Sequence, residues 1–156
     1  NQFANDDNWK AHYKTTGPEI WNDTEHKVTH FVSSMGTTGT IMGTSTFLKE
    51  KNSDIKIVGV QPSDNASIPG IRKWPKEYLP KIFNPKKVDQ VIEVSEEEAR
   101  AMTIRLAKEE GVFAGMSSGG ATAAALKLIE TLEEGVVVSI VCDRGDRYLS
   151  SDLFEE

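Results

Sequence analysis

The apolar run at residues 136–141, VVVSIV, constrains the fold more than any other part of this chain. A strand that is apolar at almost every position is typical of a parallel sheet, in which helices cover both faces. Further short apolar runs occur at residues 28–33, 55–60 and 88–94, with helix-like segments between them. This alternation predicts the α/β class: an open, mostly parallel, twisted sheet with helices on both faces.

The segments between the strands carry helix signals at residues 40–49, 96–110 and 116–132. Ser95 and Glu98 have the spacing of a capping box, in which each side chain binds the backbone amide of the other residue. Gly111 is a suitable stop for the helix that they start. Residues 62–87 differ, because prolines interrupt any periodicity there, and an irregular segment of this length is usually a functional loop.

Composition narrows the class of protein. A chain of 156 residues with 38% hydrophobic residues can bury one core of ordinary size, so one domain is expected. No apolar run reaches the ~18–20 residues of a membrane helix, and the N-terminal residues lack the pattern of a signal peptide, so we expect a cytoplasmic protein with no membrane partner. A net charge of -6 with both signs interspersed argues against nucleic acid. One cysteine and three scattered histidines make a disulfide or a metal site improbable.

The segment GTTGT at residues 36–40 stands where the first strand gives way to a helix. A helix start presents unpaired amides and a partial positive charge, glycines allow close backbone approach, and hydroxyls add donors. These features predict a phosphate-binding cup, although a tight glycine turn remains an alternative. The segment is neither a P-loop nor a dinucleotide fingerprint, because the lysine and the third glycine are missing. The cup residues are Gly36, Thr37, Thr38, Gly39 and Thr40.

Several motifs together have the order and spacing seen in one family. They are NQFAN, HYKTTGPEIW, GTTGT, GVQPSDNASIPGIRKWP, GVFAGMSSGGA and CDRGDRYLS. The chain resembles the cysteine synthases, most closely those of the thiosulfate-accepting B type. The resemblance implies a fold-type-II enzyme of cysteine biosynthesis that depends on pyridoxal 5′-phosphate (PLP), a transferase that replaces the acetate of O-acetylserine by sulfide or thiosulfate. It also implies a homodimer when full length, and a cofactor phosphate held by residues 36–40.

Two motifs of that family are absent from this sequence. They are the lysine that forms a Schiff base with the cofactor and the loop Thr/Ser-Ser-Gly-Asn-Thr that binds the substrate carboxylate, both in the first part of family members. We therefore expect residues 1–156 to be the C-terminal, cofactor-phosphate-binding domain of a larger two-domain enzyme, whose N-terminal segment is a partner. The chain alone is expected to be inactive and to contain no catalytic residue.

The resemblance also suggests residues beside the cofactor ring. Cys142 follows the last apolar run and is expected to face the pyridine nitrogen as a small neutral group, with Asp143 as the alternative. A buried cysteine that acts only as a small hydrophobe is the simpler explanation. Residues 117–120 could form another anion site or a small-residue helix start for close packing.

Substrate-binding residues are expected at two further places. Gln2 belongs to a Gln-Phe pair beside the substrate carboxylate, unless it is only a frayed terminal residue. Gly70, Arg72, Lys73 and Trp74 lie in the proline-rich segment, at a place that the family has near the active-site entrance. The two cations could attract thiosulfate, or they could be a solvated pair beside a packed tryptophan. Lys73 departs from the Arg-Arg-Trp pattern of B-type enzymes and lacks the planar fork of arginine.

Other functions remain open from the sequence. The chain could be a non-catalytic phosphate- or protein-binding domain derived from the same fold. Within the enzyme class, cystathionine β-synthases and serine/threonine dehydratases share the fold, although GIRKWP and CDRGDRYLS fit the B-type cysteine synthases better. A reading frame that continues upstream into a lysine-bearing segment would favour the enzyme.

Overall fold

A single four-stranded sheet organises the protein. The computed structural model describes residues 1–154, and its strands lie in the order β3-β2-β1-β4. All three neighbouring pairs are parallel, which confirms the predicted α/β class. The strands are β1 (His30–Ser34), β2 (Lys56–Pro62), β3 (Gln90–Val94) and β4 (Val137–Ser139).

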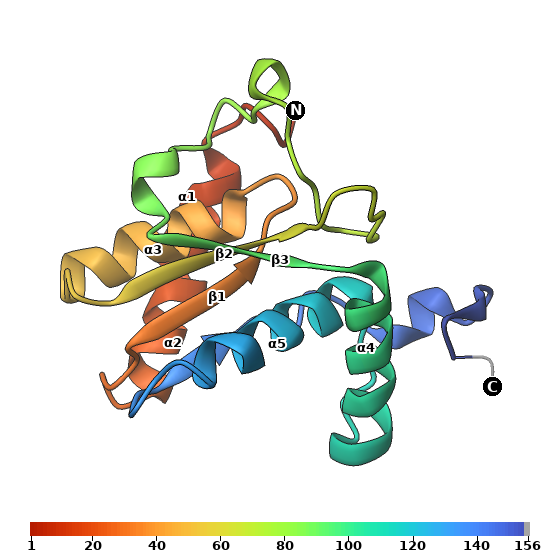
Figure 1. Cartoon of the computed structure of the whole chain (residues 1–156). Helices are drawn as coiled ribbons and strands as arrows, with labels where there is room; N and C mark the ends of the chain where they lie inside the picture. Colours follow the sequence, from red (N-terminus) through yellow and green to blue (C-terminus); the bar gives the residue numbers. More distant parts are fainter. Residues whose placement is uncertain (155–156) are drawn as a thin grey trace.

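Helices cover both faces of this sheet (Figure 1). Along β1, Phe31 packs with the side of helix α3 (Gly39–Lys51), whereas Val32 packs with the side of helix α5 (Met116–Ile129). Successive strand residues point to opposite faces, so the central strands must be apolar throughout. Phe31 and Val32 are both fully buried.

The run at residues 136–141 is less buried than its composition predicts. Its paired part, β4, is the edge strand and is only half-buried, and Val141 is 54% exposed. The prediction of burial on both faces is therefore wrong for this run within the described residues. An edge position explains the difference, because β4 has a neighbouring strand on one side only.

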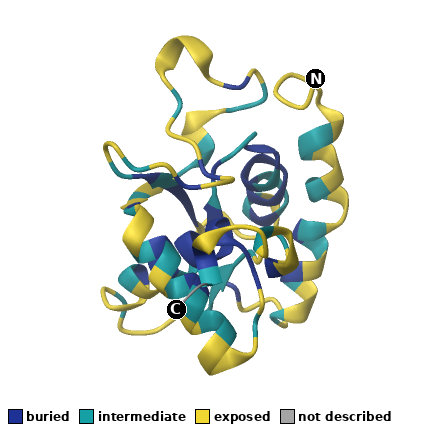
Figure 2. Cartoon of the chain, turned by 90° about the vertical axis from the view of Figure 1, so that its right-hand side faces the viewer, coloured by how far each residue is buried: buried dark blue, intermediate teal, exposed yellow. Residues whose placement is uncertain are grey.

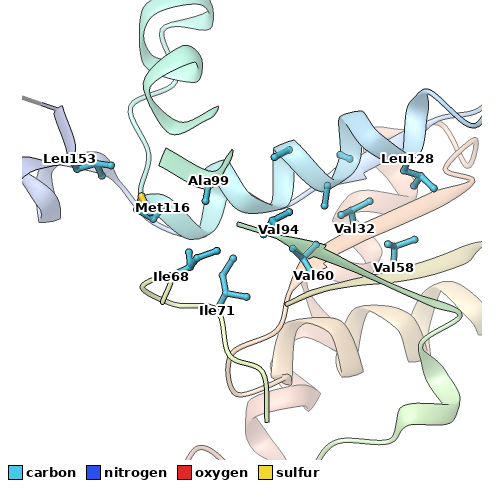
Figure 3. Packing of buried hydrophobic residues seen from close by; sticks show 13 residues of the cluster. Val32, Val58, Val60, Ile68, Ile71, Val94, Ala99, Met116, Leu128 and Leu153 are labelled. Carbon is cyan, nitrogen blue, oxygen red and sulfur yellow. The ribbon is translucent and has the colours of Figure 1, made fainter. Parts of the chain in front are cut away.

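Helix α4 (Glu96–Glu110) begins and ends as the sequence predicts. The Ser95 hydroxyl accepts from the Glu98 amide, and the Glu98 carboxylate accepts from the Ser95 amide, which confirms the capping box. Gly111 ends the helix in the left-handed region, at φ 67°. Small residues of α5 allow α4 to approach closely: a Cβ added to Gly119 would collide with the Ala99 carbonyl oxygen. Figure 3 shows the apolar cluster beside these helices, including Val32, Val94 and Ala99.

Two helices precede the sheet and were not assigned from the sequence. Helix α1 (Asp7–Lys14) packs against α3, and α2 (Thr16–Asp23) follows it. Asp6 and Thr15 occupy the N-cap positions, but neither side chain makes a capping hydrogen bond. Gly43 permits the close contact of α1 with α3, because a Cβ there would collide with the Trp9 carbonyl oxygen.

The proline-rich segment is irregular apart from two 3₁₀ turns, η1 (Lys76–Tyr78) and η2 (Pro85–Lys87). Ile68 and Ile71 anchor it in the core, since both are buried. Two more 3₁₀ turns lie near the C-terminus, η3 (Gly145–Tyr148) and η4 (Asp152–Phe154). Exposed residues concentrate in the outer helices and loops (Figure 2). No helix within residues 1–154 is long and apolar enough to span a membrane.

Candidate functional site

A cavity of about 300 Å³ lies where β1 ends and α3 begins. This is the carboxyl end of the parallel strands, where open α/β sheets bind their ligands. Part of its wall comes from the predicted cup and part from the segments that follow α4 and β4. The lining residues are Ser34, Gly36, Thr37, Thr38, Thr40, Gly70, Ser117, Cys142, Asp143 and Arg147.

The cup has free hydrogen-bond donors. Within the described part of the chain, the backbone N–H groups of Gly36, Thr37 and Thr38 have no hydrogen-bond acceptor. Thr38 adopts a left-handed conformation with φ 71°, which is uncommon for a threonine, and its buried Oγ1 has no partner within residues 1–154. Helix α3 starts at the next residue, Gly39, so the helix dipole adds positive potential to the same place. This geometry suits an anion.

The proline-rich segment braces the cup from outside. The Trp74 indole Nε1–H donates to the Gly36 carbonyl at 2.7 Å, and the Arg72 amide donates to the Met35 carbonyl at 2.8 Å. Gly36 lies against the backbone of Gly70, because a Cβ added to Gly36 would be 2.9 Å from the Gly70 carbonyl oxygen. Gly70 therefore reaches the cavity wall, whereas Trp74 lies behind the loop and fixes its shape.

Neither cation of this segment, Arg72 or Lys73, lines the cavity at the cup. The Lys73 Nζ contacts Asp64 at 2.8 Å and Glu93 at 2.7 Å, and hydrogen bonds to these two carboxylates raise the pKa of Lys73. Arg72 lines a neighbouring cavity of about 210 Å³ together with Trp74. The Arg72 guanidinium has no hydrogen-bond or ion-pair partner within residues 1–154. Arg72 is thus the more available cation of the pair.

Opposite the cup, serine and cysteine side chains form the wall. The Ser34 hydroxyl donates to the Ser117 carbonyl at 2.8 Å, and the Cys142 amide donates to the Ser118 hydroxyl at 2.9 Å. Cys142 is exposed as a residue, yet neighbouring atoms desolvate its thiol and raise its pKa, while the hydrogen bond with Ser117 acts in the opposite direction. The thiol is therefore neutral near pH 7.

Asp143 contributes an acidic side chain to the lining, which also includes the basic side chain of Arg147. Its Oδ2 accepts from the Tyr148 hydroxyl at 2.7 Å, whereas its Oδ1 is buried without a hydrogen-bond partner among the described residues. Burial and then the bond to Asp143 raise the pKa of Tyr148 to about 12. Gly115 makes room for this pair, because a Cβ there would collide with both the Tyr148 ring and Asp143 Oδ1. A carboxylate oxygen with free acceptor capacity suits a ligand that donates a hydrogen bond.

Besides Arg72, Lys73 and Trp74, the predicted residues Gln2 and Gly39 also lie outside the lining of this cavity. Gln2 is exposed, and its backbone carbonyl accepts from Asn8 Nδ2 at 2.7 Å. Gly39 is buried against Asn8: a Cβ added to Gly39 would collide with Asn8 Oδ1. Asn8 Nδ2 also donates to the Thr37 hydroxyl at 3.0 Å. These residues thus support the cup from behind.

Sequence reasoning missed Ser34 and Arg147 in the lining, and left Ser117 undecided. Ser117 is the second residue of α5, so its place in the first turn of a helix was the available signal. Asn8 and His12 were not singled out, because their contacts with the cup depend on the packing of α1 against α3. No three His, Cys, Asp or Glu side chains of residues 1–154 are grouped as in a metal site.

Comparisons with known proteins agree on one family. The model of the family "Pyridoxal-phosphate dependent enzyme" matches residues 1–143. Cysteine synthase B of Pseudomonas aeruginosa is 59% identical over 154 residues, which cover 99% of this chain and 52% of that protein. Cysteine synthase B of Escherichia coli is 56% identical over 155 residues, which cover 99% of this chain and 51% of that protein.

A solved structure agrees with these sequence matches. O-acetyl serine sulfhydrylase isoform 3 of Entamoeba histolytica superposes with a TM-score of 0.91 at 35% identity, and the match covers 100% of this chain and 49% of that one. The chain therefore spans about half the length of the relatives that it matches.

Proposed function

The chain belongs to the family of pyridoxal-phosphate dependent enzymes, and from this premise we propose that it forms the cofactor-phosphate-binding part of a cysteine synthase of the B type. The complete enzyme replaces the acetate of O-acetylserine by sulfide or thiosulfate, and gives cysteine or S-sulfocysteine. It acts in the cytoplasm as a homodimer. The proposal rests on the 59% identity to a cysteine synthase B and on the free donors of the cup.

The residues present fit the phosphate of PLP. Three unpaired amides and the threonine hydroxyls of the cup supply the donors that a phosphate dianion requires. The unpartnered Oγ1 of Thr38 is a buried polar atom that needs a partner. The cavity volume of about 300 Å³ lies at the lower end of the range for small-molecule sites.

Each wall of the cavity has its own role in this proposal. Residues 36–40 would hold the phosphate, and Ser117 and Cys142, which line the same cavity, would be available to the ring. Either neutral side chain can hydrogen-bond the pyridine nitrogen without protonating it, and Asp143 is the alternative partner. When bound, PLP withdraws electrons from the α-carbon of the amino-acid substrate, and the nitrogen partner tunes this property. Trp74 and Gly70 keep the cup in shape.

Arg72 is proposed to favour thiosulfate at the entrance. Its guanidinium has no ion-pair partner within residues 1–154, so it is available to an anionic nucleophile such as thiosulfate. Lys73 was expected to share this role, but its ammonium is paired with Asp64 and Glu93. We therefore assign most of the selectivity to Arg72 and a smaller, long-range contribution to Lys73.

The lysine that binds the cofactor covalently is proposed to lie outside this chain, in an N-terminal domain of the same enzyme. In support of this, the cavity lining within residues 1–154 contains no lysine. Gln2 is proposed to lie beside the substrate carboxylate once that domain is present.

A paired assay tests the proposal. The product of the complete reading frame should form cysteine from O-acetylserine and sulfide, whereas residues 1–156 with PLP should form none. Borohydride reduction of that mixture should leave no single lysine of residues 1–156 fully labelled. An inactive full-length product that still binds phosphate would favour a binding domain. One stoichiometrically labelled lysine within residues 1–156 would show that this chain has its own covalent site.

A further inference from the structure

Helix α1 places polar side chains against both ends of the cup. Asn8 contacts Thr37, and His12, four residues later, has its Nε2 3.4 Å from the Thr40 Oγ1. Residues four apart lie on the same face of a helix, so one face of α1 faces both threonines. Neither Asn8 nor His12 lines the cavity. Their effect on a bound anion must therefore pass through the threonine hydroxyls.

The orientation of the Asn8 amide follows from its neighbours. One end of the amide faces the Gln2 carbonyl oxygen at 2.7 Å. A carbonyl only accepts hydrogen bonds, so the NH₂ end must be the one that faces it. The same nitrogen lies 3.0 Å from the Thr37 Oγ1. The two hydrogens of Asn8 Nδ2 thus go to Gln2 and to Thr37, and Thr37 must accept.

This arrangement sets the direction of the Thr37 hydroxyl. Its oxygen accepts from Asn8 and, at a longer 3.4 Å, from the Gly39 amide. A hydroxyl has two lone pairs and one hydrogen, so both acceptor positions are engaged. The remaining hydrogen is free to donate into the cavity, which Thr37 lines. The phosphate dianion of PLP has no hydrogen and can only accept there.

We propose that Asn8 is a positioning residue that fixes the Thr37 hydroxyl as a donor to an anion in the cup. The proposal rests on the proposed function, because it assumes that residues 36–40 hold a phosphate. Asn8 stabilises the bound anion without touching it. Because Asn8 donates to the Thr37 hydroxyl, that hydroxyl cannot donate to Asn8 and its hydrogen stays available to the anion. Gln2 contributes through its backbone carbonyl, which holds the amide in this orientation.

The test exchanges the donor for an acceptor of the same shape. In Asn8→Asp, the atom facing Thr37 becomes a carboxylate oxygen, so the hydroxyl turns to donate to it and away from the cavity. Binding of inorganic phosphate is measured from the backbone amide NMR shifts of residues 36–40. We expect Asn8→Asp to weaken binding about tenfold or more, as for lost hydrogen bonds to a charged group. Asn5→Asp adds the same charge at an exposed position of the preceding turn and should weaken binding at most about twofold.

A double-mutant cycle separates the effect of Asn8→Asp on the Thr37 hydroxyl from the effects of its added charge and of general structural damage. In the Thr37→Val background the hydroxyl is gone, so Asn8→Asp should cost only the repulsion between its charge and the anion, and clearly less than it costs when Thr37 is present. An equal loss in both backgrounds would overturn the proposal. If Asn8→Asp does not fold, Asn8→Leu takes its place, with an expected loss of about threefold when Thr37 is present and no loss in the Thr37→Val background.

The wild-type titration distinguishes this proposal from the proposed function. Phosphate binding that shifts residues 36–40 and is unchanged by Asn8→Asp overturns the role of Asn8 alone. The absence of any shift at residues 36–40 in the wild type overturns both.

Discussion

The indole N–H of Trp74 should stabilise the shape of the cup through its hydrogen bond, and this effect should exceed that of the apolar packing of the ring. Trp74→Phe keeps a ring that can contact Phe3, which lies edge-on at 5.6 Å, but removes the hydrogen bond of 2.7 Å to the Gly36 carbonyl. An unpaired buried carbonyl costs ~1–3 kcal/mol. Because Gly36 is half-buried and water can partly replace the indole, we expect about 1–2 kcal/mol of lost unfolding free energy, or a melting temperature lower by ~2–8 °C.

Thermal unfolding and phosphate titration together measure this effect. Trp21→Phe is the matched control: Trp21 is also half-buried, but it stacks on His26 at 4.6 Å and its indole N–H has no acceptor within residues 1–154. Trp74→Phe should lose stability relative to this control and bind phosphate several-fold more weakly. Equal destabilisation by both substitutions, with unchanged phosphate affinity, would refute the bracing role of Trp74.

Three further predictions concern other parts of the chain. Ser95→Ala removes one half of the capping box and should lower the unfolding free energy by about 1 kcal/mol in urea denaturation, with no effect on phosphate affinity. The pKa of Tyr148 is raised from 10.0 to about 12, so the folded state favours the protonated phenol. The stability that this shift provides is complete below pH ~10 and should be lost between pH ~10 and 12 in the wild type. Tyr148→Phe should not show this loss. In the complete enzyme, Arg72→Gln should reduce the use of thiosulfate more than the use of sulfide, and should reduce thiosulfate use more than Lys73→Gln does. The preference for thiosulfate should shrink as salt rises, because the Debye length is only ~8 Å at physiological ionic strength. Equal losses for both nucleophiles would assign Arg72 to folding or closure.

The fold was predictable from local patterns wherever those patterns were strong. Apolar runs located all four strands, and the capping box with Gly111 located α4 at both ends. Helices α1 and α2 were not predicted, because each has only 8 residues and owes its stability to packing against α3. The apolar run at residues 136–141 predicted a strand but not its edge position, since composition does not reveal the order of strands in a sheet.

Parts of the cavity lining were predicted from short motifs: most of residues 36–40 from GTTGT, and Gly70, Cys142 and Asp143 from the family resemblance. The segment GTTGT predicted the cup through glycines at a strand-to-helix turn, and three of its amides have no acceptor within residues 1–154, as suits a phosphate site. Arg147 joins the cavity because the fold brings its distant segment there, whereas Ser34 ends β1 only two residues before the cup and could have been included. The pairing of Lys73 with Asp64 and Glu93 likewise needed the structure, because the partners come from different segments.

The central claim is that residues 36–40 hold the cofactor phosphate. An NMR titration of the protein with PLP, inorganic phosphate and pyridoxal, which lacks the phosphate, tests it most directly. The account predicts that PLP and phosphate shift the amides of residues 36–40, and that pyridoxal leaves them unshifted. Shifts of equal size with pyridoxal, or phosphate-dependent shifts confined to other residues, would contradict it.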